Sequence, residues 1–196
     1  MIINNSSSSR FTMPALVVLA GVLYCSVHLL NGYLMKSMEV SDHISFLYLP
    51  SFLRLMNVLV LGLVWGTLGT ALGGILLMYF WVNDSFLMAL CNTVVSASGA
   101  ALAVLAMRIL QQRHLSLTKL SDLLQLALLY ALLNALLHHL LWTTFDPSQI
   151  VSPNQVAYMA IGDLNGAILG ALALRWLATH TRLIDLIRHR AHADEP

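Results

Sequence analysis

The chain has 196 residues, of which 58% are hydrophobic and 10% are charged, and its mean hydropathy is +0.76. Soluble domains carry about 25% charged residues, so this composition excludes a soluble globular protein and indicates a polytopic membrane protein. The formal net charge of +1 gives no reason to expect nucleic acid as a partner, and the lipid bilayer is the partner that the composition predicts.

The N-terminal region starts with a polar, serine-rich stretch, residues 1–13, which we interpret as a disordered tail. Arg10 precedes the first apolar run, as a basic residue precedes the apolar core of a signal peptide. No small-residue cleavage motif closes this run, so we expect it to be retained as the first helix.

Six apolar segments follow one another along the chain, most of them near the ~20 residues that a membrane-spanning helix requires. They are Pro14–Met35, Ile44–Val64, Thr67–Val82, Phe86–Leu110, Leu120–Thr143 and Asn154–Ala178. The boundary at Trp65-Gly66 is the weakest, and residues 62–69 fit either a tight turn or a short re-entrant segment. We therefore predict an all-α fold, a bundle of six transmembrane helices at residues 14–178, followed by a basic tail at residues 179–196.

The distribution of basic residues predicts the orientation of this bundle. If both termini are cytoplasmic, eight of the ten Lys and Arg residues lie on the cytoplasmic side, in agreement with the positive-inside rule. These eight are Arg10, Arg108, Arg113, Lys119, Arg175, Arg182, Arg188 and Arg190. Lys36 then lies in an outer loop, and Arg54 lies within the membrane.

Two charged residues, Arg54 and Asp163, lie deep inside the second and sixth apolar segments. A charge at the bilayer centre costs at least about 2.5–3.5 kcal/mol, so it persists where it is paired or used. Because the two lie roughly ten and nine residues inward from the outer ends of their segments, they share nearly the same depth. A bidentate ion pair is therefore expected if the two helices touch. Such a pair fits two roles, a structural staple that fixes helix register or a polar site that binds a ligand.

Further polar side chains lie in the outer half of the predicted bundle. Asn57 shares a helical face with Arg54, whereas Asn165 points about 160° away from Asp163. Polar side chains face the interior of a bundle or a wet cavity, because lipid offers them no partner. We predict an outward-opening ion-pair or ligand site with a polar rim. The site consists of Arg54, Asp163, Asn57, Asn92 and Asn165, and the rim of His28, Asn134 and His138. The alternative for each residue alone is an ordinary hydrogen bond between helices.

No metal, cofactor or catalytic activity is predicted. His138 and His139 are adjacent and diverge by about 100° on a helix, which disfavours a shared metal ion. A haem held by His28 and His138 is disfavoured because haem proteins of this kind have paired histidines on facing helices, and one partner is missing here unless His139 contributes. Motifs of hydrolases, metalloproteases and nucleotide-binding proteins do not occur in the sequence, so we expect a non-enzymatic protein. Cys25 and Cys91 show neither ligand nor disulfide spacing.

Glycines recur every four residues, at Gly162, Gly166 and Gly170 and again at Gly69 and Gly73. Small residues at this spacing allow the backbones of membrane helices to approach closely. We expect these glycines to lie inside the bundle, with a homodimer seam as the alternative.

Several short motifs together resemble the MASE1-type integral membrane sensor regions of bacteria. They are Leu47-Tyr48-Leu49-Pro50-Ser51, a glycine-rich turn around Trp65, the helix that holds Asn92 and ends in Arg108, and Gly162-Asp163-Leu164-Asn165-Gly166. The resemblance covers roughly residues 46–175, and it implies a multi-pass protein of the bacterial cytoplasmic (inner) membrane with a sensory role. MASE1 regions have more spans and precede an output domain, whereas only a short tail follows the last predicted span here. Signalling would therefore require a partner protein.

These features predict a non-enzymatic membrane protein, a sensor or accessory subunit that binds a small ligand or a membrane protein partner through the polar intramembrane site. A homo-oligomer is another form that the partner can take. Two other roles fit six spans in a short chain. One is the substrate-binding component of a transporter of the energy-coupling-factor kind, and the other is a structural subunit of a larger membrane complex.

Overall fold

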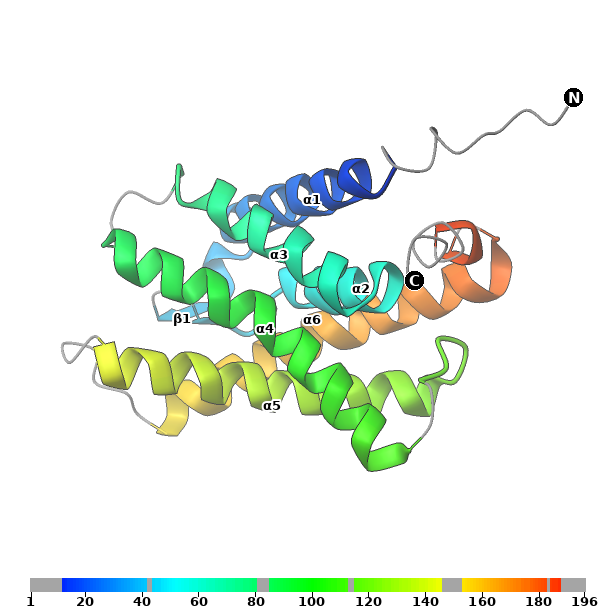
Figure 1. Cartoon of the computed structure of the whole chain (residues 1–196). Helices are drawn as coiled ribbons and strands as arrows, with labels where there is room; N and C mark the ends of the chain where they lie inside the picture. Colours follow the sequence, from blue (N-terminus) through cyan, green and yellow to red (C-terminus); the bar gives the residue numbers. More distant parts are fainter. Residues whose placement is uncertain are drawn as a thin grey trace, which may run out of the picture.

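The computed structural model describes residues 12–41, 44–80, 85–112, 115–145, 153–182 and 184–187, which form a helical bundle (Figure 1). Its α-helices are α1 (Thr12–Leu34), α2 (Pro50–Leu61), α3 (Leu63–Leu77), α4 (Phe86–Gln111), α5 (Leu120–Phe145) and α6 (Pro153–His180). Between α1 and α2 lie a 3-10 turn, η1 (Lys36–Met38), and an antiparallel hairpin of β1 (Glu39–Ser41) and β2 (Ile44–Ser45). The predicted helical class is therefore confirmed.

Successive helices reverse direction, so the bundle has two distinct ends (Figure 1). At the hairpin end, which carries β1 and β2, α1, α3 and α5 finish while α2, α4 and α6 begin. We call the opposite end the basic end, because it gathers basic residues of the described helix ends and connections: Arg108, Lys119, Arg175 and Arg182. The start of α1 and the end of α6 both lie there.

Four helices, α1, α4, α5 and α6, are long and apolar enough to cross a membrane. The prediction of six spans is wrong, because α2 and α3 have only 12 and 15 residues. At about 1.5 Å per residue they rise by roughly 18 and 22 Å, less than the ~30 Å of the hydrocarbon core. Ile44–Ser45, which the sequence placed in the second span, form β2, and the helix starts only at Pro50. Apolar composition does not distinguish an extended segment from a helix, which explains the error.

A single residue, Gly62, separates α2 from α3. Its backbone has φ 85°, a left-handed conformation that glycine adopts without steric cost. Gly66 lies within α3 rather than in the break, and a Cβ atom there would be 2.3 Å from the carbonyl oxygen of Asn57. The break between the two helices is therefore a tight turn at Gly62 instead of at Trp65-Gly66, and residues 63–69 belong to α3.

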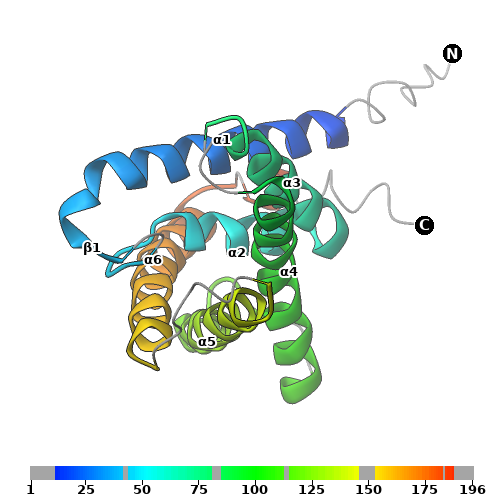
Figure 2. The same cartoon turned by 90° about the vertical axis from the view of Figure 1, so that its left-hand side faces the viewer.

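Seen from the hairpin end, α2 lies in the middle of the bundle, with the other helices around it (Figure 2). Most residues of α2 are buried, including Arg54 and Asn57. The helix is thus too short to span a membrane but is enclosed by helices that are long enough. This position accounts for a charged residue on α2, because the side chain faces protein instead of lipid.

Small residues fill the interior of the bundle, and large apolar residues cover its outside. Ala100, Ala103 and Ala127 are fully buried between α4 and α5. By contrast, Leu19 and Leu136 expose 62% and 57% of their surfaces. Membrane helices associate through close packing of small residues, and their large apolar side chains face lipid. The packing therefore agrees with that of a helical bundle that lies in a lipid bilayer.

The glycine repeat of α6 provides the groove in which the segment before α2 lies. Cβ atoms at Gly162 and Gly166 would each be 1.9 Å from a backbone oxygen, that of Ser45 and that of Tyr48. The amide of Tyr48 also donates to the carbonyl oxygen of Gly162 at 3.1 Å. The predicted close packing inside the bundle is confirmed here, and it brings the start of α2 directly against α6.

The two predicted tails fall largely outside the described residues. Residues 1–11 and 188–196 are not among them, and α1 already begins at Thr12. α6 continues to His180, two residues beyond the predicted end at Ala178. Ile184, which belongs to the predicted tail, is only 4% exposed and packs in an apolar cluster with Leu174.

Candidate functional site

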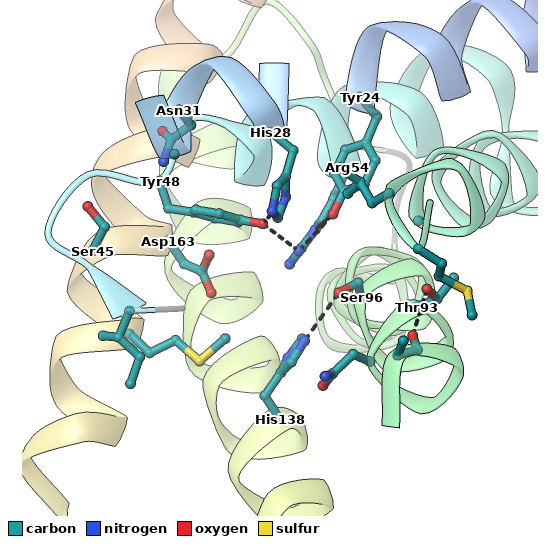
Figure 3. Close-up of a pocket in the computed structure, with 18 of the residues that line it drawn as sticks. Tyr24, His28, Asn31, Ser45, Tyr48, Arg54, Thr93, Ser96, His138 and Asp163 are labelled. Atoms are coloured by element: carbon teal, nitrogen blue, oxygen red, sulfur yellow. Dashed lines mark hydrogen bonds between the residues drawn. The ribbon is translucent and has the colours of Figure 1, made fainter. Parts of the chain in front are cut away.

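A cavity of about 150 Å³ lies at the hairpin end, between the β-hairpin and helices α1, α3, α4, α5 and α6 (Figure 3). Its lining reaches from exposed residues such as Glu39 and Gly32 to the deeply buried Arg54 and Asp163. A buried water needs at least about 10–15 Å³ of such space, so the cavity has room for several water molecules. The cavity occupies the space in front of α2, where the chain is still extended.

Arg54 lies at the floor of this cavity with 3% of its surface exposed. Its Nε and Nη2 atoms both donate to Tyr24 Oη, at 3.0 and 2.9 Å, and Nη2 also donates to Tyr48 Oη at 3.1 Å. Nη1 donates to Tyr130 Oη and to Asn134 Oδ1, each at 3.2 Å. A guanidinium group has five N–H donors, and these five bonds use all of them.

The rings of two of these tyrosines also contact the charge. Arg54 Cζ lies 5.5 Å from the ring centroid of Tyr24 and 5.2 Å from that of Tyr48. Cations within about 6 Å of an aromatic face are attracted by the ring quadrupole, and more strongly where water is excluded. Since Tyr24 lies on α1 and Tyr130 on α5, the arginine ties both helices to α2.

Asp163 is 1% exposed and reaches the same floor from α6. Ser51 Oγ donates to its Oδ1 atom, and Asn134 Nδ2 donates to its Oδ2 atom at 2.6 Å. Because Asn134 also accepts from Arg54, its amide forms a bridge between the two charges. The charges are of opposite sign, so the floor as a whole carries no net charge.

The structure brings Arg54 and Asp163 together, as the sequence predicted, but through Asn134 rather than as a bidentate ion pair. The guanidinium fork is already filled by three phenol oxygens and one amide oxygen, which leaves no N–H group for the carboxylate. Asn134, predicted at the rim, is fully buried behind the cavity and does not line it, and it contacts Arg54 and Asp163 there.

The hairpin side of the cavity is held by hydrogen bonds to α1. Tyr48 Oη lies 2.8 Å from His28 Nδ1, so the predicted rim residue His28 joins the tyrosine network. Asn31, near the end of α1, accepts from the amide of Leu49 through its Oδ1 atom at 2.9 Å. Both bonds fix the extended segment that forms this wall of the cavity, as Figure 3 shows for Tyr48 and His28.

The opposite wall joins α4 to α5. His138 Nε2 lies 3.1 Å from Ser96 Oγ, and its Nδ1 atom lies 2.9 Å from the backbone oxygen of Asn134 (Figure 3). Nearer the hairpin end, Trp142 Nε1 donates to Asn92 Oδ1 at 2.9 Å. His138 and Asn92 thus line the cavity, as predicted, and each also makes a bond between helices.

Two predicted site residues lie elsewhere. Asn57 is buried but donates to Thr70 Oγ1 on α3 at 3.2 Å, so it stabilises the α2–α3 pair instead of lining the cavity. Asn165 is exposed, and its Nδ2 atom donates to the backbone oxygen of Phe46 at 2.9 Å. Its predicted rotation away from Asp163 explains this position.

Sequence reasoning missed the hydroxyl groups that hold the two charges. Tyr24, Tyr48 and Tyr130 each accept from Arg54, and Ser51 donates to Asp163. A signal was present, because a buried tyrosine hydroxyl needs a hydrogen-bond partner. Tyrosines inside apolar segments should therefore be counted with the charged and amide residues when an intramembrane site is predicted.

The side chains of the described residues include no cluster of three or more histidine, cysteine or acidic groups that could hold a metal ion. His139 Nδ1 lies 2.8 Å from the backbone oxygen of Ala135, and its ring lies 5.0 Å from that of Trp142. Comparison of the chain with protein-family models, with curated proteins and with solved structures gives no match. The resemblance to MASE1-type regions therefore stays a prediction.

Proposed function

We propose that this protein binds a small polar ligand within the membrane, in the cavity at the hairpin end, and that it acts as a sensor or accessory subunit. The observation that carries the proposal is the cavity itself, which runs from exposed Glu39 to buried Asp163. Ligand sites are concave and mainly apolar, with a few polar groups that fix orientation. Ile44, Leu77 and Met159 provide apolar lining here, and Asn92 and Asp163 provide polar groups.

Under this proposal Arg54 shapes the site rather than touching the ligand. All five of its N–H groups are donated to protein oxygens, so none remains for a bound anion. The arginine instead holds Tyr24 and Tyr48 in place, and both line the cavity. The two roles that the sequence left open are then combined, with Arg54 as the staple and Asp163 as part of the site.

The basic residues support an orientation with the hairpin end outside the cell. Arg108, Lys119 and Arg175 lie at the opposite end, and cytoplasmic loops of membrane proteins are enriched in Lys and Arg. The α2–α3 pair begins and finishes at the hairpin end, so it does not change the side of the membrane. With α1, α4, α5 and α6 as the four spans, the start of α1 and the end of α6 then lie on the same side. The cavity then receives its ligand from the outside of a bacterial cytoplasmic membrane.

A sensory role is supported by the contact between two of the motifs that resemble MASE1-type regions. The Leu47–Ser51 motif lies on the Gly162–Gly166 motif, through the bond from the Tyr48 amide to Gly162 and the bond from Ser51 to Asp163. These motifs therefore act as one unit at the cavity floor. Under this proposal a membrane protein partner is one receiver of the signal.

Native mass spectrometry of protein extracted gently from its own membranes tests this proposal. We expect a bound small molecule on the wild-type protein and its loss from Ala89→Trp, because Ala89 lines the cavity and an indole there fills it. Leu90→Trp is the matched control, since Leu90 is 38% exposed and its neighbour in sequence.

The control should keep the bound molecule as the wild type does. A wild-type protein that carries no small molecule, from native membranes or after incubation with membrane extract, would contradict the proposal. Equal retention by Ala89→Trp would place the molecule outside this cavity.

A further inference from the structure

A serine and a histidine lie within hydrogen-bond distance of each other in the cavity, and the proposed binding function does not use their chemistry. Ser96 Oγ on α4 lies 3.1 Å from His138 Nε2 on α5, and both residues line the cavity (Figure 3). A short sequence motif cannot mark this pair, because its members are 42 residues apart and on different helices. A hydroxyl beside an imidazole is the arrangement in which serine acts as a nucleophile.

The backbone of α5 determines which nitrogen of His138 carries the hydrogen. His138 Nδ1 lies 2.9 Å from the backbone oxygen of Asn134, one turn earlier on the same helix. A carbonyl oxygen only accepts hydrogen bonds, so Nδ1 carries the hydrogen and donates it. Nε2 of the neutral ring is then an acceptor, and the Ser96 hydroxyl donates to it. This is the tautomer that a general base needs, and the carbonyl orients the ring as a carboxylate does in a serine–histidine–aspartate triad.

One helical turn nearer the hairpin end, Asn92 offers a donor for a developing negative charge. Its Oδ1 atom accepts from Trp142 Nε1 at 2.9 Å, so the orientation of the amide is settled. Its Nδ2 group has no partner among the described residues, and Asn92 lines the cavity. Asn92 and Ser96 are four residues apart on α4, so they share a face, with their Cβ atoms about 5–6 Å apart. A carbonyl carbon bonded to Ser96 Oγ can therefore direct its oxygen toward Asn92, as an oxyanion hole requires.

The charges of the lining restrict the substrate. Arg54 and Asp163 have opposite signs, and exposed Glu39 adds a second carboxylate, so with neutral histidines the lining carries one net negative charge. An anionic acyl compound is therefore disfavoured, whereas an uncharged one adds no charge to a poorly solvated place. Ile44 and Leu77 provide apolar lining for a short acyl chain. Since the cavity reaches an exposed residue, water can enter it as well.

We propose that the cavity is also a hydrolytic site, in which Ser96 is the nucleophile toward a small uncharged ester. This inference rests on the proposed binding function and adds a reaction and a class of substrate to it. Under it the protein is an enzyme, unlike the non-enzymatic protein expected from sequence motifs alone. Ser96, His138 and Asn92 are its catalytic residues, as nucleophile, general base and oxyanion donor.

The reaction has two steps, and both use His138 to move a proton. In the first, Ser96 Oγ bonds to the ester carbonyl carbon while its proton passes to His138 Nε2, and the carbonyl oxygen becomes an oxyanion that accepts from Asn92 Nδ2. The bond from this carbon to the alcohol oxygen then breaks, and the alcohol leaves with the proton from His138. In the second, a water molecule gives a proton to His138 and bonds to the acyl carbon. The carboxylic acid leaves, and Ser96 Oγ recovers the proton.

A small serine-reactive reagent tests the nucleophile. Purified protein in detergent is incubated with diisopropyl fluorophosphate, from which an activated serine oxygen displaces fluoride at phosphorus. Peptide mass spectrometry then locates the modified residue. We expect the label on Ser96 of the wild-type protein and its loss from Ser96→Ala. Ser98→Ala is the matched control and should be labelled as the wild type is, because Ser98 Oγ donates to the backbone oxygen of Val95 and Ser98 does not line the cavity.

Hydrolysis of p-nitrophenyl acetate, an uncharged ester, tests the roles of the other two residues. The release of p-nitrophenolate is followed by absorbance. Ser96→Ala should reduce the rate to that of the ester without protein. His138→Gln should lower the rate about 100-fold or more through loss of the general base, and Asn92→Ala about 100-fold through loss of the oxyanion donor. Asn165→Ala is the control and should hydrolyse the ester as the wild type does, because Asn165 bonds outside the cavity.

Three results would overturn the inference. They are a wild-type protein that takes up no label, a label on other residues but not on Ser96, and ester hydrolysis that Ser96→Ala leaves unchanged. The first two are measured on the wild-type protein, so a variant that fails to fold leaves the test intact. A co-purified small molecule on a protein with an unreactive Ser96 would contradict this inference while supporting the binding function. A labelled Ser96 on a protein that carries no small molecule would do the reverse.

Discussion

The half of the bundle at the hairpin end and the half at the basic end are built from the same helices but bury different chemistry. Toward the basic end, Leu126, Val104 and Met107 pack with small alanines in one apolar cluster. Toward the hairpin end, Arg54 and Asp163 lie below a cavity. The difference follows from where α2 begins. Residues 46–49 are not helical, and an extended chain places fewer side chains along a given length than a helix does.

This comparison shows how a short helix creates a site in a bundle of longer ones. A full-length second span would fill the hairpin half with side chains, as α4 and α5 do elsewhere. Because the helix starts only at Pro50, the surrounding helices enclose a space that protein does not fill. The basic half then supplies stability, and the hairpin half supplies a place for a ligand.

Removing the charge in the hairpin half should have the largest effect. Arg54→Leu leaves three phenols, Asn134 and a buried carboxylate without their cation, so we expect a loss of about 3–5 kcal/mol of unfolding free energy. Denaturant unfolding in detergent micelles measures it. Arg182→Ala, at an exposed position, is the control and should change stability by less than about 0.5 kcal/mol.

The same measurement with a double variant tests the coupling between the charges. Asp163→Asn in the Arg54→Leu background should cost at least about 1 kcal/mol less than it does alone, because the carboxylate has already lost its compensating charge. Strictly additive losses would show that the Asn134 bridge transmits no energy between the two groups.

An added methyl group at the α6 groove should have the next largest effect. Gly166→Ala places a Cβ 1.9 Å from the backbone oxygen of Tyr48, and a backbone atom cannot yield as a flexible side chain does. We expect a loss of about 3 kcal/mol and weaker ligand binding, because the extended wall must move. Gly32→Ala is the control for stability alone, since a Cβ there meets nothing within 4 Å, while Gly32 itself lines the cavity. Unchanged stability of Gly166→Ala would disprove the close approach.

Substitutions in the basic half should lower stability without changing ligand affinity. Leu126→Ala, at a position 1% exposed, opens a void in the apolar cluster and should cost about 2 kcal/mol or more. Ligand affinity measured by calorimetry should stay within about two-fold of the wild type. Leu128→Ala, which is 50% exposed, is the control and should affect neither quantity. A large loss of affinity in Leu126→Ala would show that the two halves are not independent.

Composition and periodicity were enough to predict a helical membrane-type bundle and the meeting of Arg54 with Asp163. They failed at α2, because apolar residues such as Ile44 and Phe46 count equally in a strand, an extended segment and a helix. They also failed at the partners of Arg54, since hydropathy treats Tyr24 and Tyr130 as part of the apolar background. Which hydroxyl meets which charge depends on helix rotation and tilt, and these arise from packing at glycines such as Gly166.

The hydrogen-bond partners of Arg54 are synthesised at different times, because they lie on both sides of it in the sequence. Tyr24 and Tyr48 precede the arginine by 30 and 6 residues, whereas Tyr130 and Asn134 follow it by 76 and 80. During synthesis, therefore, α2 can present its charge to two phenols before the second half of the bundle exists. Arg54 therefore has a partner on α1 available first, and α5 adds the other two later.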